Sequence, residues 1–316
     1  MSVHVVVGAG PVGSALATLL ADQGHGVRVI TRSGRGPVHP GVERLRADAA
    51  DPAALAKHVA GAAALYNCAN PPTYQAWETQ WPPLAAALLR AAEGSDAVLV
   101  TMGNLYGYGP VDGPISRDHP LAAASRKGRL RARMWQEALA AHAAGRARVT
   151  EVRASDYLGP GVTPATGLLA RYAQTVRAGR PTWVFGDPDA PHSWSYVPDI
   201  ARTLAVAGTD ERAWGQAWHV PSDPPVAVRA VLADLARLAG RRPPRVHRVP
   251  RSVLRAAGPF VPVLRELDEM LYQFERPFEI DAAVTTSTFG IRPTPWPEVL
   301  AGVAAGWSPA AASRQA

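Results

Sequence analysis

The sequence contains a single cysteine, Cys68, among its 316 residues. An internal disulfide is therefore excluded, and a reducing compartment, the cytoplasm, is the expected location. No stretch approaches the roughly 20 apolar residues of a transmembrane helix, so no membrane partner is expected. A glycine-rich segment begins at Gly8, which leaves too little sequence before it for a signal peptide.

Lysine is nearly absent, because only Lys57 and Lys127 among the 33 basic residues are lysine. The formal net charge of +7 favours anionic ligands. A nucleic-acid-binding surface would need clustered basic and aromatic residues, and the only basic cluster, 126–131, falls in a predicted helix. We therefore expect no nucleic-acid partner. The nine histidines form no metal-spaced pair with cysteine, so no metal is expected either.

The first residues read as a strand, a glycine-rich turn and a helix. Residues 3–7 are mostly β-branched, residues 8–13 follow the pattern Gly-x-Gly-x-x-Gly, and residues 14–21 are good helix formers. In such a turn Gly8 allows the tight bend, Gly10 lets a pyrophosphate approach the backbone, and Gly13 lets helix and strand pack closely. The helix N-terminus offers free N–H groups to phosphates. The segment, including Pro11 and Val12, predicts a dinucleotide site.

An acidic residue is missing where an NAD-specific site would have one. The second predicted strand, 27–30, is followed by Thr31, Arg32 and Ser33, and no acid occurs between Asp22 and Glu43. A guanidinium at this point suits the 2′-phosphate of NADP(H), with Ser33 as a second donor. The alternative is a solvated loop arginine. We therefore expect NADP(H) as the cofactor.

The N-terminal half alternates between strands and helices. Further strands are expected to end at 45–48 and to cover 62–66, 97–102 and 148–153; helices are expected at 51–59, 77–92 and 126–144. Pro82-Pro83 must kink the helix at 77–92 or mark its start. Such alternation predicts an α/β fold with a doubly wound parallel sheet and ligands at the carboxyl ends of its strands. The residues expected to line the cofactor at these ends are Asp48, Ala49, Ala69, Asn70, Ala154 and Ser155.

Several further segments, taken in order, resemble the extended short-chain dehydrogenases/reductases of the NAD-dependent epimerase/dehydratase family. The matching segments are 8–13, 48–51, 67–70, 98–107, 153–161, 186–187, 195–199 and 288–294. The resemblance implies a Rossmann NADP-binding domain over 1–160, to which a strand and a helix return from about 186–240. It implies a mainly substrate-binding domain over 161–316, and a homodimer formed through two Rossmann helices.

The catalytic residues of this family are missing here. The family has Ser or Thr four residues before the Tyr of its Val-Tyr-Gly segment, where this chain has Met102; Thr101 is one residue earlier and would face the other side of the strand. An alignment without gaps puts Lys127 at the family's catalytic Tyr and Arg131 at its Lys. An alternative alignment keeps Lys127 as the family's Lys but leaves Ala123 at the Tyr.

Other groups must therefore carry the chemistry. Arg131 stays charged and would hold ribose hydroxyls. Lys127 would act as the acid, with a pKa lowered by Arg131 and an apolar pocket, unless it is an exposed helix lysine or a phosphate contact. Tyr106, Asp156 and Thr101 are the other catalytic candidates. The candidates for substrate contact are Met102, Asn104, Tyr108, Tyr157, His192, Trp194 and Tyr196.

Three functions remain open. The first is an NADPH-dependent reductase of a C=N, C=C or C=O bond in a small metabolite, with a non-standard proton donor. The aromatic residues of the second half favour a hydrophobic substrate over a nucleotide sugar, as in bacterial secondary metabolism. The second is a redox-neutral epimerase, dehydratase or cyclase. The third is a non-catalytic NADP(H)-binding regulator.

Overall fold

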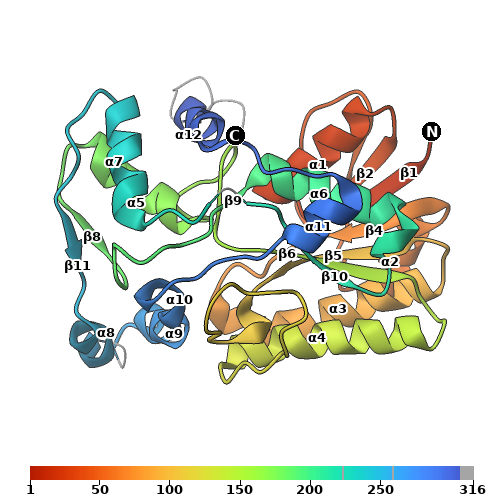
Figure 1. Cartoon of the computed structure of the whole chain (residues 1–316). Coiled ribbons are helices and arrows are strands. Elements are labelled where there is room, and N and C mark those ends of the chain that lie inside the picture. Colours follow the sequence, from red (N-terminus) through yellow and green to blue (C-terminus); the bar gives the residue numbers. More distant parts are fainter. Residues whose placement is uncertain (223, 258–259, 307–316) are drawn as a thin grey trace.

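A seven-stranded parallel sheet forms the centre of the larger domain (Figure 1). The computed structural model describes residues 1–222, 224–257 and 260–306. The strands lie in the order β3-β2-β1-β4-β5-β6-β10. Their bounds are β1 Val3–Val7, β2 Gly26–Thr31, β3 Val42–Arg46, β4 Ala62–Asn67, β5 Val98–Asn104, β6 Val149–Ala154 and β10 Ala217–His219. Because β1 pairs with β2 on one side and β4 on the other, the strand order reverses there, and such reversals place the ligand crevice of open α/β sheets.

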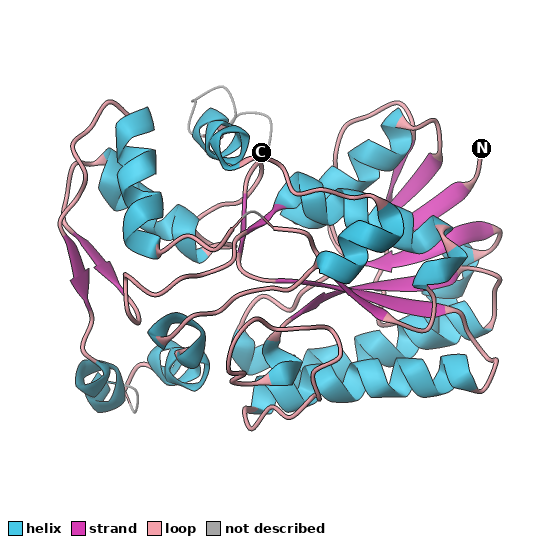
Figure 2. Cartoon of the chain, in the orientation of Figure 1, coloured by secondary structure: helices cyan, strands magenta, loops and turns pink. Residues whose placement is uncertain are grey.

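Helices cover both faces of this sheet (Figure 2). One face packs against α1 (Pro11–Asp22) and α6 (Val197–Thr209). The opposite face packs against α2 (Pro52–Val59), α3 (Trp77–Glu93) and α4 (Arg126–Ala143). The side chains of β1, β4 and β5 are almost all buried, as expected for parallel strands covered on both faces. The structure is thus the doubly wound fold that the sequence predicts.

Helix α3 passes through two prolines. The sequence predicts a kink or a start at Pro82-Pro83, but the helix begins at Trp77 and continues past both residues. Each proline lacks an N–H group and leaves one carbonyl of the preceding turn without its helical partner. Both prolines are exposed, so water can satisfy those carbonyls at low cost.

A smaller domain, with its own core, lies beside the carboxyl ends of the strands (Figure 1). Its elements are α5 (Leu168–Arg177), β8 (Thr182–Val184), α7 (Val228–Leu238), β11 (Val246–Arg248), α8 (Arg251–Ala257), α9 (Pro262–Met270), α10 (Tyr272–Glu275) and α12 (Trp296–Ala305). Between the domains, β7 (Tyr157–Leu158) pairs with β9 (Ser195–Tyr196). From β9 the chain returns to the large domain as α6 and β10, and α11 (Ala283–Phe289) later packs against β10.

Three short 3-10 helices complete the described elements. They are η1 (Tyr74–Ala76), η2 (Tyr106–Tyr108) and η3 (Glu211–Ala213). The first two follow β4 and β5 at the end of the sheet that faces the smaller domain. This position brings their tyrosines close to the crevice between the domains.

Candidate functional site

The glycine turn between β1 and α1 has the shape of a pyrophosphate cradle. Gly8 has a φ of +94°, and a Cβ there would lie 2.8 Å from the backbone of Ala69. A Cβ on Gly13 would lie 2.0 Å from the carbonyl oxygen of Gly8, whereas one on Gly10 would meet no atom within 4 Å. Helix α1 has no side-chain cap and no acid in its first turn, so its N–H groups stay open to an anion. A nicotinamide dinucleotide fits these residues.

A substitution at Gly10 tests cofactor binding without disturbing the fold. Its φ of −69° suits alanine, and the added methyl group would point into free space. We expect Gly10→Ala to leave the unfolding temperature unchanged while the methyl group blocks the pyrophosphate and weakens dinucleotide binding by roughly 100-fold, about 2.7 kcal/mol. Fluorescence titration with NADPH measures this. Gly26→Ala, whose methyl would meet Val3 at an ordinary 3.8 Å, is the matched control and should bind as the wild type does.

Exposed arginines surround the carboxyl ends of β2 and β3. Thr31 is paired with Arg46 in the ladder, and the Thr31 hydroxyl donates to the carbonyl of Arg35 at 2.8 Å, which closes the loop after β2. The side chains of Arg32, Arg35 and Arg46 are exposed, and no ion pair of theirs is present among the described residues. The Ser33 hydroxyl accepts from the Arg35 N–H and still has its own hydrogen to donate.

The remaining predicted cofactor residues lie around the same crevice. One carboxylate oxygen of Asp48 accepts from Ala50 N–H at 3.0 Å, and Ala49 is buried beneath this turn. Ala69 touches the glycine turn through its backbone, while the Asn70 amide donates to the carbonyl of Pro71. Ala154 is buried in the core and Ser155 follows it.

Strand β5 shows why Thr101 does not replace the missing serine. The pairing of β5 with β6 is regular from Leu99 to Asn104, so the backbone makes no bend that could turn Thr101 toward the cofactor. Thr101 instead lines a cavity beneath α3 and α4, and Met102 packs on the opposite face against the α1 and α6 core. The expectation of a catalytic Thr101 is therefore wrong, because alternate residues of a strand face opposite sides.

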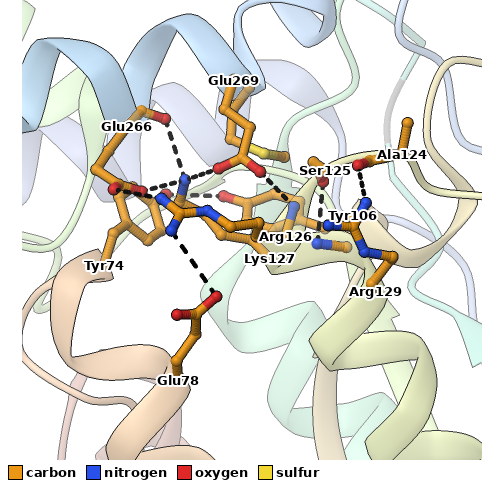
Figure 3. Close-up of polar contacts among 12 residues, drawn as sticks. Tyr74, Glu78, Tyr106, Ala124, Ser125, Arg126, Lys127, Arg129, Glu266 and Glu269 are labelled. Atoms are coloured by element: carbon orange, nitrogen blue, oxygen red, sulfur yellow. Dashed lines mark hydrogen bonds and ion pairs between the residues drawn. The ribbon is translucent and has the colours of Figure 1, made fainter. Parts of the chain in front are cut away.

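Lys127 is buried in an ion-pair cluster that joins the two domains (Figure 3). Its ammonium contacts the Glu266 carboxylate at 2.5 Å, the Glu269 carboxylate, and the backbone carbonyl of Glu266 at 3.3 Å. The neighbouring Arg126 also pairs with Glu266. An ammonium has three N–H groups, and all three are used here. Lys127 therefore has no donor left for a substrate, which corrects the prediction of a free catalytic acid in an apolar pocket beside Arg131.

Burial alone would raise the pKa of Glu269 in this cluster. The hydrogen bond and charge of Lys127, with those of Arg126, outweigh burial and hold the pKa of this carboxyl below its usual value. The Lys127 ammonium also lies 4.9 Å from the centre of the Tyr74 ring. We call Arg126, Lys127, Glu266 and Glu269 the interdomain ion-pair cluster.

Arg131 follows Lys127 by one helical turn and is also buried. It donates to the backbone carbonyl of Met102 at 2.7 Å and lies over the ring of Trp81 at 4.8 Å. Burial lowers the pKa of Arg131, and the nearby charge of Glu151 opposes this effect. The guanidinium thus holds the end of β5, and its other N–H groups have no acceptor among the described residues.

Tyr106 forms a hydroxyl pair with Tyr74, a residue that sequence reasoning missed. The two oxygens are 2.9 Å apart. Burial raises the pKa of Tyr106 well above its usual value, with further contributions from Tyr74 and Asp156. Burial likewise raises the pKa of Tyr74 to about 12. Both phenols therefore stay protonated near neutral pH, so Tyr106 can donate a hydrogen bond but does not serve as a base.

Asp156 and His192 form a second polar pair at the end of β6. The Asp156 Oδ2 lies 3.1 Å from His192 Nε2, and His192 Nδ1 donates to the carbonyl of Gln273 at 3.2 Å. His192 is stacked on Phe274 and buried, whereas the Asp156 side chain is 28% exposed. The Ser155 hydroxyl lies 3.4 Å from the same Nε2 and can donate to it when Nε2 carries no proton. Asp156 and His192 are thus placed to exchange a proton through Nε2, and the carboxylate is the more exposed of the two.

Two predicted substrate contacts, Tyr108 and Trp194, belong instead to the protein interior. The Tyr108 hydroxyl accepts from Arg153 at 2.5 Å and donates to His219 Nε2 at 2.8 Å. Burial lowers the pKa of His219 to about 4, so this histidine stays neutral and able to accept. Trp194 is in the core of the smaller domain and donates to the carbonyl of Val226. Tyr196 packs against the same core and α12. The assignments of Tyr108 and Trp194 to the substrate were wrong, because long-range partners already occupy their polar atoms. Tyr196 is half-buried, and its contact with a substrate stays a prediction.

Asn104 and Tyr157 remain beside the crevice. The side-chain Oδ1 of Asn104 accepts from the backbone N–H of Tyr106, which fixes the start of η2. Tyr157 is half-buried, and burial raises its pKa, with contributions from Asp156 and Cys68. Glu266 and Glu269 were missed from the sequence, although one signal was present: their spacing of three places both on one helix face, where a buried lysine could find them.

Comparison with known proteins agrees with this architecture. A solved epimerase from Methanothermobacter thermautotrophicus is 18% identical, with a TM-score of 0.79 over 97% of this chain and 93% of that one. A dTDP-glucose 4,6-dehydratase from Bacillus anthracis, solved with NAD, is 17% identical (TM-score 0.77, 96% and 95% covered). A UDP-glucuronic acid 4-epimerase from Bacillus cereus, also solved with NAD, is 16% identical (TM-score 0.76, 95% of each chain). No curated protein matches the sequence.

The described residues contain neither a membrane-spanning helix nor a cluster of metal ligands. No helix within the described residues is long and apolar enough to cross a membrane. Within the same residues, no group of three or more histidine, cysteine or acidic side chains is arranged to hold a metal ion.

The model of the NAD-dependent epimerase/dehydratase family matches residues 4–220, which include the glycine turn, the sheet and the Asp156–His192 pair. The chain belongs to this family.

Proposed function

We propose that the protein is an NADP-dependent, redox-neutral enzyme that epimerises, dehydrates or cyclises a small organic molecule. The observation that carries this proposal is the Asp156–His192 pair, whose Oδ2 and Nε2 lie 3.1 Å apart just after β6, close enough to exchange a proton. The nicotinamide dinucleotide, when bound, supplies a hydride acceptor and donor. The solved structural neighbours include epimerases and a dehydratase, which supports a reaction without net oxidation.

Asp156 takes the role that the missing tyrosine would have. Its second oxygen has no hydrogen-bond partner among the described residues, so it can accept a proton from a substrate hydroxyl or an activated C–H. His192, with its own proton on Nδ1 toward the Gln273 carbonyl, then takes the accepted proton from the carboxyl on its free Nε2. Tyr106 and Tyr74, which stay protonated, orient a substrate oxygen by hydrogen bonding.

A direct test uses deuterium. Purified protein is incubated in D₂O with NADP⁺ and a panel of small hydroxylated and carbonyl compounds, and products are followed by mass spectrometry and NADPH absorbance. A redox-neutral enzyme gives an isomer, a dehydrated product or deuterium incorporation with no net change in NADPH. Net oxidation of NADPH with formation of a reduced product would contradict this proposal. The protein would then be an NADPH-dependent reductase, the function that a site selective for NADP(H) favours.

The preference for NADP(H) rests on the arginines after β2 and β3. If Arg32 holds the 2′-phosphate, Arg32→Ala removes a charged hydrogen bond and should weaken NADPH binding by about 1.5–3 kcal/mol while NADH binding stays nearly constant. Fluorescence titrations with both cofactors measure the difference. Arg242→Ala, an equally exposed arginine in the smaller domain, is the control. Equal effects of Arg32→Ala on NADPH and NADH would show that Arg32 does not bind the 2′-phosphate.

A further inference from the structure

A cavity of about 210 Å³ lies between the sheet and helices α3 and α4, apart from the glycine turn. Its apolar walls come from Leu88 of α3, Leu99 and Val149 of the sheet, and Trp135 of α4. Its polar lining consists of the buried or half-buried Asn67, Thr101, Arg131, Thr150 and Glu151 and the exposed Arg90, Glu93 and Glu137. The cavity is partly enclosed and opens between the two helices. None of the functions argued above uses this space.

Arg131 reaches this cavity at the point where β4 ends. The ladder between β4 and β5 stops at Asn67 and Thr101, so the carbonyl of Met102 extends past its last partner on that side. Arg131 donates to this carbonyl, which accounts for one of the five N–H groups of its guanidinium. The remaining N–H groups lie at the boundary of the cavity.

The charges at this end of the cavity do not balance. Glu151 accepts from Arg153 at 3.0 Å, and these two buried side chains form a pair. Arg131 has no carboxylate in contact among the described residues, although its exposed fraction is only 7%. Glu151 acts on Arg131 through its charge but is bonded to Arg153, so one carboxylate serves two buried cations. An anion next to Arg131 would supply the second negative charge.

Asn67 gives a second, independent sign of an absent ligand. Its side chain is 1% exposed, and its Oδ1 has no hydrogen-bond partner in the protein. Most buried side-chain polar atoms in proteins have a partner, so an unpaired amide oxygen in the lining of a cavity indicates a missing donor. A protonated or hydroxyl group of a ligand would supply it.

We propose that this cavity binds a small hydroxylated carboxylic acid with a single ring or an equally compact apolar body, and that the hydroxyl donates to Asn67. The carboxylate pairs with Arg131, and the ring lies among Leu88, Leu99 and Trp135. An apolar cavity of about 150 Å³ is large enough for benzene, so 210 Å³ holds one ring and a carboxylate. Because Arg131 also holds the end of β5, an occupied cavity fixes the strand next to the cofactor crevice.

The test uses benzoate as the probe and isothermal titration calorimetry as the measurement. Benzamide and benzylamine have nearly the same shape but are neutral and cationic. We expect saturable benzoate binding at least tenfold tighter than that of either analogue. It should be unchanged when NADPH is present at saturation. No saturable binding, equal binding of the three probes, or competition with NADPH would each overturn the proposal.

Two variants locate the probe. Ala138 lines the cavity, whereas Ala140 is exposed on the same helix and does not. Ala138→Leu should fill the cavity and weaken benzoate binding at least tenfold, and Ala140→Leu should bind benzoate as the wild type does. NADPH affinity, measured in both variants, shows that each is folded. Benzoate binding that survives Ala138→Leu would place the probe elsewhere and overturn the assignment.

Discussion

Lys127→Met is expected to destabilise the protein by about 3 kcal/mol, the largest effect on stability that we expect from a single substitution outside the apolar core. The substitution keeps the length of the side chain but removes the charge between Glu266 and Glu269. Two largely buried carboxylates would then face each other without the ammonium that compensates them. The value lies at the lower end for a broken buried ion pair, because the Glu269 side chain is 21% exposed. Chemical denaturation measures it.

The chain offers a matched control for this substitution. Lys57 is the only other lysine and is exposed on α2, so Lys57→Met should change the free energy of unfolding by less than about 0.5 kcal/mol. Combining Lys127→Met with Glu266→Gln and Glu269→Gln removes the like charges and should recover much of the loss. If Lys127→Met is as stable as Lys57→Met, the interdomain ion-pair cluster does not hold the domains together.

The contribution of the interdomain ion-pair cluster to the free energy of unfolding depends on pH. The pKa of Glu269 is held below its unfolded value, so the folded protein binds fewer protons at this group than the unfolded chain does. Its contribution to stability is therefore present above the unfolded pKa, about 4.3, and is lost as pH falls through the folded pKa. Lys127→Met removes the main cause of this depression and should flatten that part of the stability curve.

Local signals were sufficient for the large domain and for the cofactor turn. Val3–Val7 and the glycine turn were predicted correctly, because strand, turn and helix follow one another within about 20 residues and depend on local sterics. Helix α3 differs, since an exposed position makes Pro82 and Pro83 tolerable, and exposure is a property of the fold rather than of the dipeptide.

The candidate site was less predictable, because its polar partners are far apart in the sequence. Lys127 meets Glu269 across 142 positions, and Tyr108 meets His219 across 111. An expectation based on neighbours alone placed Arg131 beside Lys127 and missed both glutamates. Charge balance is the physical signal that was available: a buried lysine must find carboxylates. Which carboxylates it finds depends on how α9 packs against α4.

Asp156→Asn is the substitution expected to reduce turnover most, by about 100-fold or more, in the reaction identified by the deuterium screen. The amide keeps the shape of the carboxylate and can still hydrogen-bond to His192. It cannot accept a proton and therefore cannot pass one to His192. Dinucleotide affinity should remain within about threefold of the wild type, because the glycine turn lies on a different strand. Steady-state rates and NADPH titration measure the two quantities.

A pH profile separates proton transfer from simple positioning. If Asp156 and His192 share the transferred proton, a limb of the profile of kcat/KM in the wild type belongs to the pair and should disappear in Asp156→Asn. Asp118→Asn makes the same chemical change at an exposed carboxylate outside the crevice and should keep both the rate and the profile. If the Asp156→Asn variant retains most of the activity with an unchanged profile, a group other than Asp156 transfers the proton. Tyr106 and Tyr74 would then need the same tests, and since burial raises the pKa of each, they would act as acids rather than bases.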